Sequence, residues 1–332
     1  MSTEIFVISG FLGAGKTTLI QKLLKESFRH EKVALIENDF GDISVDAALL
    51  KSGGIEVKEM NSGCICCSLS GDFIKALREL LDLFHPDKIV IEPSGVGKLS
   101  DIMKACSDPR ILPLAKVKAK ITIVDVKRCK MYLDNFGEFF EDQIQNADAV
   151  LLSRAEEFPA QVNAACEIIR GLNPHAVIFS KPWGQINVDE ILHPHRNNRV
   201  RIEQHVHTHD CNCGCHGAHS YAEHEHSHDD DHNCSCGHHH AAADVFDTVT
   251  IRTNRLFSIE DLQERLSNME RSATGTILRA KGIVRGPSEY MNLQYLPGDI
   301  KVTKCATKGN MLCIIGRNLN RQELCILFSG EC

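Results

Sequence analysis

Two short stretches carry residues whose types and spacing could do chemistry, and the first is "GFLGAGKT" at residues 10–17. It matches the pattern G-x-x-x-x-G-K-[ST], with a strand-like run before it and a helix-like run after it. In such a loop, backbone N–H groups surround phosphate oxygens at a helix N-terminus. We predict a nucleotide site in which Lys16 reaches the β- and γ-phosphates and the Thr17 hydroxyl binds Mg²⁺. The other predicted nucleotide-binding residues of this loop are Gly10, Gly13, Ala14, Gly15 and Thr18.

Such a phosphate-binding loop also needs an acid near the Mg²⁺ and a segment that senses the γ-phosphate. "KIVIEPSG" offers Glu92 at the end of an apolar strand, followed by Gly95, whose backbone can turn towards a γ-phosphate. "ENDFGDISVD" offers Asp39, Asp42 and Asp46 where a first switch would lie. We predict Lys16, Thr17 and Glu92 as catalytic residues. Asp42 and Asp46 are predicted metal ligands. Taken singly, each acid is equally well a helix cap or a solvated loop residue.

The second stretch is "GCICC", which places Cys64, Cys66 and Cys67 within four positions. Adjacent cysteines do not reach the usual disulfide geometry, and three thiolates suit Zn²⁺, whose tetrahedral shell would then lack one ligand. In an extended segment Cys64 and Cys66 share a face, so a common ion requires a turn at Cys67. We predict a transition-metal site; a Cys64–Cys66 redox pair and buried structural thiols remain alternatives.

Residues 205–240 form a second metal-binding candidate, with 12 of the 17 histidines, six acidic residues and no Lys or Arg. Almost nothing here is apolar, so we predict a linker that is disordered unless metal orders it. Imidazole and thiolate suit Zn, Ni, Co and Cu, and composition does not choose among them. It is either a metal store or a solvated spacer, and its predicted ligands are Cys211, Cys213, Cys215, His216, Cys234 and Cys236.

Composition limits the classes of protein that remain. A formal charge of −7 over 332 residues argues against a general nucleic-acid binder, which needs a basic face. No apolar window is long enough to span a membrane, and the N-terminus lacks an export-signal pattern, so we expect a cytoplasmic protein. Most of the 15 cysteines are then reduced thiols, and Cys106, Cys166 and Cys313 are expected to be core residues.

The segments that must position these residues alternate short β-branched runs with longer amphipathic ones over residues 1–200. This alternation predicts an α/β P-loop NTPase domain with a mostly parallel sheet. The His/Cys-rich linker follows at 201–243, and 244–332 reads as a smaller α+β domain in which strands dominate.

The motifs "GFLGAGKTTLI", "ENDFGDISVD", "GCICC", "EPSG" and "ILRAKG" together resemble the CobW family of P-loop GTPases. The resemblance covers both predicted domains, and its most specific element is the C-x-C-C motif between the two switch segments. It implies GTP, Mg²⁺ and Zn²⁺ or Co²⁺ as cofactors, and delivery of metal to a client metalloprotein or cofactor-assembly enzyme. It also implies that Cys64, Cys66 and Cys67 are the metal ligands and that Glu92 belongs to the second switch.

One segment departs from the family pattern. Where the family reads guanine with N-K-x-D, this chain has Ser153, Arg154, Ala155 and Glu156. The Glu156 carboxylate can accept the two guanine N–H bonds, and the planar Arg154 guanidinium can stack on the base. We predict both as nucleotide-binding residues and favour GTP over ATP.

The sequence therefore predicts a GTP hydrolase that acts as a metallochaperone or metal-insertion factor. We see no general base, and we expect slow turnover that a partner stimulates. We expect the C-terminal domain to contact clients or a second subunit, as in a homodimer, with no role for nucleic acid or membrane. The alternatives are a non-enzymatic metal buffer and a cobalamin or hydratase cofactor-assembly factor.

In "RAKG", Arg279 and Lys281 form either a solvated basic edge or a contact to nucleotide or an acidic partner.

Overall fold

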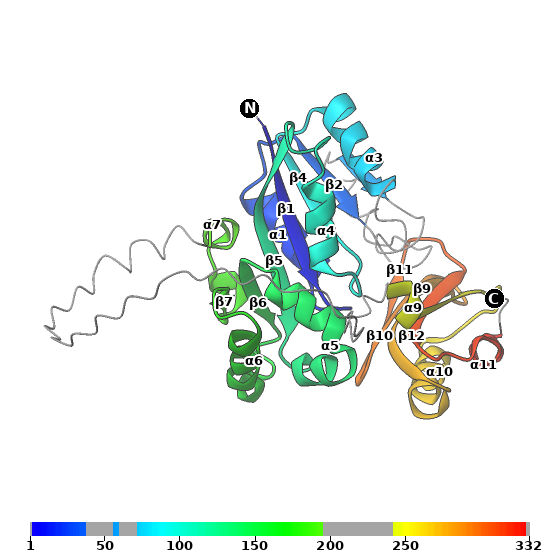
Figure 1. Cartoon of the computed structure of the whole chain (residues 1–332). Helices are drawn as coiled ribbons and strands as arrows, with labels where there is room; N and C mark the ends of the chain where they lie inside the picture. Colours follow the sequence, from blue (N-terminus) through cyan, green and yellow to red (C-terminus); the bar gives the residue numbers. More distant parts are fainter. Residues whose placement is uncertain (1, 38–55, 60–71, 195–241, 330–332) are drawn as a thin grey trace, which may run out of the picture.

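A computed structural model describes residues 2–37, 56–59, 72–194 and 242–329 of the chain. In the first unit, seven strands form one sheet in the order β3-β2-β4-β1-β5-β6-β7 (Figure 1). Each neighbouring pair runs parallel, which confirms the predicted class of sheet. The strands are β1 (Thr3–Gly10), β2 (Val33–Glu37), β3 (Glu56–Glu59), β4 (Lys88–Glu92), β5 (Ala115–Asp125), β6 (Ala149–Ser153) and β7 (Val177–Phe179).

Helices cover both faces of this sheet, because successive residues of a strand point to opposite sides. In β1, Phe6 and Ile8 pack with α1 and α7, whereas Ile5 and Val7 pack with α3, α4, α5 and α6. None of the described helices is both long and apolar enough to cross a bilayer. The helices are α1 (Lys16–Glu26), α3 (Asp72–Glu79) with the π-helical turn η1 (Leu80–Phe84), α4 (Leu99–Cys106), α5 (Cys129–Gln145), α6 (Pro159–Leu172), the 3-10 turn η2 (Trp183–Gln185) and α7 (Val188–Leu192).

The carboxyl ends of the parallel strands meet at one edge of the sheet. Strands β1, β2, β4 and β5 end there at Gly10, Glu37, Glu92 and Asp125. Open parallel sheets bind ligands in the crevice outside these ends. The fold therefore brings the P-loop, which follows Gly10, next to Glu92.

The second unit is a five-stranded antiparallel sheet in the order β11-β10-β9-β12-β8. Its helices α10 and α11 pack against one face, which confirms the predicted α+β class. The sequence runs "FDTVTIRT", "GTILRAKGIVRG", "EYMNLQYL" and "MLCIIGRN" predict β8, β9, β10 and β12, whereas β11 matches none of them. The elements are α9 (Ala242–Val245), β8 (Asp247–Arg252), α10 (Ile259–Ser272), β9 (Thr276–Arg285), β10 (Tyr290–Leu296), β11 (Asp299–Cys305), β12 (Met311–Arg317) and α11 (Arg321–Leu327).

The other face of the antiparallel sheet packs on the first unit, so the two units share one apolar core. Leu278, Cys313 and Ile315 of the second unit belong to the same buried cluster as α5. Phe246 is 3% exposed, and its ring centroid lies 5.0 Å from that of Phe139. Figure 1 shows the second sheet beside α5 and the lower ends of β1 and β5.

The scattered cysteines follow their predicted burial in part. Cys106 and Cys313 are buried, and Cys166 is half-buried. Burial raises the pKa of Cys106 to about 12, so this thiol stays protonated at neutral pH and is a poor metal ligand.

Truncating Phe246 tests the shared core. We expect Phe246→Ala to lower the free energy of unfolding by about 3–5 kcal/mol, the usual cost of removing a buried aromatic ring. The measurement is urea unfolding followed by the fluorescence of Trp183, which is the single tryptophan of the chain and lies in the first unit. The control is Leu256→Ala, because Leu256 is 55% exposed. An unchanged Trp183 transition in the Phe246 variant would show that the units unfold independently.

Candidate nucleotide site

The P-loop joins the end of β1 to the start of α1. Gly13 and Gly15 have φ angles of +67° and +109°, a left-handed backbone that glycine adopts without strain. The Lys16 side chain is 6% exposed, and its Nζ donates a hydrogen bond of 3.1 Å to the carbonyl oxygen of Gly10. The lysine therefore folds back along its own loop, and its ammonium group lies where phosphate oxygens would bind.

A cavity of about 230 Å³ opens over this loop. The Thr17 hydroxyl lies 3.4 Å from each carboxylate oxygen of Glu92, which is 7% exposed. A second acid, Glu37, reaches the cavity from the end of β2 and is 4% exposed. The lining residues are Gly13, Gly15, Lys16, Thr17, Thr18, Gln21, Glu37, Glu92, Pro93, Ser94, Gly95, Arg279 and Gln294. We call it the phosphate cavity.

Gly95 approaches the P-loop too closely for any side chain. A Cβ atom on Gly95 would lie 2.8 Å from the backbone nitrogen of Leu12. The Gln143 side chain is fully buried, and its Nε2 donates to the carbonyl oxygens of Gly95 at 3.2 Å and Gly97 at 2.8 Å. The loop after β4 is thus held in place by Gln143, and its residues Pro93, Ser94 and Gly95 line the phosphate cavity.

A larger cavity of about 460 Å³ continues from the same loop. The Trp183 indole covers Gly15, and its Nε1 donates to the carbonyl oxygen of Leu152 at 2.8 Å. An aromatic wall and the polar residues after β6 suit a purine base. The lining residues are Gly13, Ala14, Gly15, Thr18, Leu152, Ser153, Arg154, Ala155, Glu156, Glu157, Lys181, Pro182, Trp183, Arg279, Gln294, Tyr295, Leu296, Asp299 and Lys301. We call it the base cavity.

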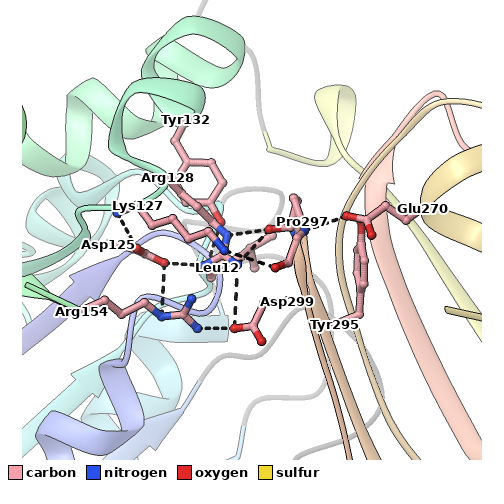
Figure 2. Close-up of polar contacts among 11 residues, drawn as sticks. Leu12, Asp125, Lys127, Arg128, Tyr132, Arg154, Glu270, Tyr295, Pro297 and Asp299 are labelled. Atoms are coloured by element: carbon pink, nitrogen blue, oxygen red, sulfur yellow. Dashed lines mark hydrogen bonds and ion pairs between the residues drawn. The ribbon is translucent and has the colours of Figure 1, made fainter. Parts of the chain in front are cut away.

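A network of charged groups ties the rim of the base cavity to the second unit, as Figure 2 shows. Arg154 pairs with Asp299 of β11 at 2.6 Å, and its Nε lies 3.7 Å from Asp125. Asp125 also pairs with Arg128 at 2.6 Å, and both side chains are 2% exposed or less. Arg128 in turn donates to the carbonyl oxygen of Pro297 at 2.9 Å. The predicted base-reading residue Arg154 is therefore held by carboxylates from both units.

The pKa of Asp299 reflects this contact. Partial burial acts to raise the pKa of the carboxyl, but the hydrogen bond and charge of Arg154 outweigh burial and lower it. Asp299 is therefore an anion at neutral pH, and the pair with Arg154 is charged on both sides.

Lys281 is 4% exposed, so the interpretation of this lysine as part of a solvated edge is wrong. Burial lowers the pKa of Lys281 to about 8, and the nearby charge of Lys16 acts in the same direction. The thiol of Cys313 and the carboxylate of Glu37 act against that shift. Three buried charges, Lys16, Glu37 and Lys281, thus influence one another across the interface between the units.

The structure brings together most of the predicted nucleotide-binding residues. Lys16, Thr17, Glu92 and Gly95 line the phosphate cavity; Ala14, Arg154 and Glu156 line the base cavity; Gly13, Gly15 and Thr18 line both. Gly10 lines neither and accepts the Lys16 hydrogen bond. Apart from Thr17, which lines the phosphate cavity, the predicted metal ligands lie outside the described residues, namely Cys64, Cys66, Cys67, Asp42, Asp46, Cys211, Cys213, Cys215, His216, Cys234 and Cys236. Within residues 2–37, 56–59, 72–194 and 242–329, no three His, Cys, Asp or Glu side chains converge as a metal site.

Sequence reasoning missed Glu37, Trp183 and Gln294, and it left Arg279 open as either part of a solvated edge or a contact to nucleotide or an acidic partner. Glu37 follows a fully buried strand, which was a usable signal for a polar residue at the carboxyl edge of the sheet. Arg279 and Gln294 come from strands of the second unit, and no local pattern indicates that these strands meet the P-loop.

The parallel sheet, the P-loop and the cavity over it define a P-loop nucleotide-binding protein. Residues 4–180 match the CobW/HypB/UreG nucleotide-binding domain, and residues 246–330 match the cobalamin synthesis protein CobW C-terminal domain. The chain therefore belongs to the CobW/HypB/UreG family.

Three relatives are similar over part of their length. The chain is 35% identical over 178 residues to the zinc chaperone CobW of Sinorhizobium sp, covering 45% of this chain and 50% of that protein. It is 34% identical to the zinc chaperone YeiR of Escherichia coli, covering 46% and 47%, and 30% identical to YjiA of the same organism, covering 55% and 59%. The chain thus spans about half the length of these relatives. The solved Zn(II)-bound YjiA GTPase is 17% identical over 99% of this chain and 98% of that chain, with a TM-score of 0.46, too distant to support an argument.

The lowered pKa of Lys281 predicts a pH dependence of stability. An unfolded lysine has a pKa of 10.5 and the folded one about 8, so between these values the unfolded state binds more protons. The free energy of unfolding should then rise with pH from 8 to 10.5, on the order of 3 kcal/mol, and stay flat below 8 on this account. Lys281→Met should remove this rise, whereas Lys308→Met, at an exposed position, should keep it. Parallel pH profiles for wild type and Lys281→Met would contradict the assignment.

Proposed function

We propose that this protein hydrolyses GTP and uses the nucleotide cycle to bind and release a transition metal, zinc or cobalt, for a client protein. The observation that carries the proposal is the phosphate cavity, where Lys16, Thr17 and Glu92 meet at the carboxyl edge of the parallel sheet. The base cavity continues from the same loop and adds the Glu156 carboxylate. Together the two cavities suit a nucleoside triphosphate that lies across the P-loop.

The chain's own groups account for phosphoryl transfer largely through charge. The Lys16 ammonium exchanges its hydrogen bond with Gly10 for phosphoryl oxygens, where it stabilises the negative charge that develops as the γ-phosphoryl group leaves. Backbone N–H groups of the P-loop donate to the same oxygens. We assign no general base, and we expect slow intrinsic turnover that a partner accelerates.

The donor set beside the P-loop fits Mg²⁺. This ion prefers oxygen ligands and keeps several waters, and the Thr17 hydroxyl lies 3.4 Å from the Glu92 carboxylate. Thr17 would hold the ion directly with Glu92 beside it, and Asp42 and Asp46 stay predicted as further ligands. When bound, Mg²⁺ neutralises charge on the β- and γ-phosphate oxygens.

Specificity for guanine would come from Glu156 in the base cavity. A carboxylate accepts two N–H bonds from guanine, whereas adenine presents an acceptor in their place. Arg154 lines the same cavity while paired with Asp299 and Asp125, so its guanidinium face is available to the base only in that fixed orientation.

Metal handling is assigned to Cys64, Cys66 and Cys67, with the histidines and cysteines of residues 205–240 as a capture arm. Thiolates suit Zn²⁺, and relatives of this chain are named zinc chaperones. The C-x-C-C motif lies in sequence between Asp46 and Glu92. Loss of the γ-phosphate can therefore move the segments on either side of the motif and lower its affinity for the metal ion. A client metalloprotein would then receive the ion.

Removing the P-loop cation tests hydrolysis. We expect Lys16→Ala to lower kcat/KM for GTP by roughly 100-fold or more, as for loss of a preorganised donor to transition-state charge. Phosphate release with Mg²⁺, with and without Zn²⁺ or Co²⁺, measures it. The control is Lys25→Ala, on the exposed side of α1. If wild-type protein leaves GTP intact through long incubation with metal, the non-enzymatic metal buffer is the better account.

Coupling between nucleotide and metal has its own test. A chelator-competed Zn²⁺ titration should show that protein loaded with a non-hydrolysable GTP analogue binds the ion at least about fivefold more tightly than the GDP form, a typical coupling. Cys66→Ala should lose the tight site in both forms. The control is Cys166→Ala, at a half-buried free thiol of α6. Equal affinities in the two nucleotide forms would refute the coupling.

A further inference from the structure

The antiparallel sheet of the second unit meets the P-loop with one face. In β10, Met291, Leu293 and Tyr295 pack towards α10, so Gln294 and Leu296 point the other way. Leu296 lies so close to Gly13 that a Cβ atom on Gly13 would overlap its Cδ1. The C-terminal sheet is therefore in direct contact with the backbone that surrounds the phosphates.

Arg279 lies on the same face of this sheet. Its neighbour Ala280 and the later Val284 belong to the core under α10, which leaves Arg279 on the side of the first unit. Arg279 is half-buried and lines both the phosphate cavity and the base cavity. Gln294 also lines both cavities. A side chain common to the two cavities lies where they join.

The junction of the cavities corresponds to the middle of a bound nucleotide. Three residues in and just after the P-loop line both cavities: Gly13 and Gly15, which precede α1, and Thr18 in the first turn of α1. A nucleotide that lies across the loop, with its base beside Glu156 and its terminal phosphate beside Thr17, would pass its inner phosphates through this junction. Arg279 and those phosphates would meet there.

The electrostatics of Arg279 favour an anion at this point. Lys281 of the same strand is buried near Glu37, and Arg154 and Arg128 pair with carboxylates. For the Arg279 side chain, by contrast, the described part of the chain supplies no hydrogen bond and no ion pair. A half-buried guanidinium loses hydration without compensation unless an anion binds, and its planar fork matches phosphate oxygens.

We propose that Arg279 of the C-terminal unit binds the inner phosphates of the nucleotide, so that the nucleotide site is built by both units and occupancy holds them together. This inference rests on the proposed function, since it assumes a nucleoside di- or triphosphate in the two cavities. Arg279 contributes to ground-state binding of GDP and GTP alike, because it lies beside the inner phosphates and not the terminal one.

The test compares nucleotide affinities of the full chain and its Arg279→Ala and Arg279→Lys variants. Trp183 lies in the base cavity, so its fluorescence reports binding of GDP, the GTP analogue and guanosine. We expect Arg279→Ala to weaken GDP and analogue binding by roughly tenfold to 100-fold, the usual cost of one charge-assisted hydrogen-bonding partner. Arg279→Lys should recover part of the loss, and guanosine, which has no phosphate, should bind all three proteins equally.

Arg285→Ala is the matched control, because Arg285 ends the same strand, is exposed and lines neither cavity. The loss of GDP affinity in Arg279→Ala should also shrink as salt rises, since the lost contact is ionic. An Arg279→Ala protein that binds GDP as tightly as wild type would overturn the inference alone. Equal weakening of guanosine and GDP would also overturn it, by showing a structural defect. Wild-type protein that does not bind GDP would overturn the proposed function and this inference with it.

Discussion

The nucleotide site depends on one contact, the seating of the C-terminal sheet on the P-loop and on the core of the first unit. Leu296 rests on Gly13, Phe246 packs among the aromatic rings of α5, and Leu278, Cys313 and Ile315 continue the same apolar cluster. Burial of these side chains holds the C-terminal sheet over the carboxyl edge of the parallel sheet. The two cavities lie between the P-loop edge of the first unit and the C-terminal sheet.

Four charged side chains at this interface, Asp125, Arg128, Arg154 and Asp299, form one network, which constrains the geometry further. Asp125 and Arg128 are almost fully buried and 2.6 Å apart, and Arg128 also donates to the Pro297 carbonyl oxygen of the second unit. Removing one member of such a pair leaves an uncompensated buried charge, so the network strongly favours a single docking arrangement. Arg154 belongs to the same network, and the rim of the base cavity is therefore sensitive to where the second unit sits.

On the proposed function, these contacts connect phosphate binding and base binding, whose residues are far apart in the sequence. The phosphates would lie beside Lys16 and Thr17, and the base would lie beside Arg154. Both cavities also include side chains of the C-terminal sheet. Strand β2 ends at Glu37 in the phosphate cavity and leads directly into the segment that holds Asp42 and Asp46. Loss of a phosphate therefore changes the charge beside both the start of that segment and the docked second unit.

The sequence by itself determined the elements and the chemistry that depends on local order. A phosphate site was predicted from the P-loop spacing of Gly10, Lys16 and Thr17 and from the apolar strand before Glu92. The loop residues are neighbours in the chain, and Glu92 joins them because parallel strands end at the same edge of the sheet. Strand β11 was missed because it is an edge strand whose alternation rests on only two half-buried apolar residues, Ile300 and Val302, while Lys301 and Lys304 are exposed. Only the tertiary structure decided that Arg279, Gln294 and Leu296 face the P-loop, and that Lys281 is buried. Which face of a sheet meets another domain depends on packing between distant segments, and no local spacing records it.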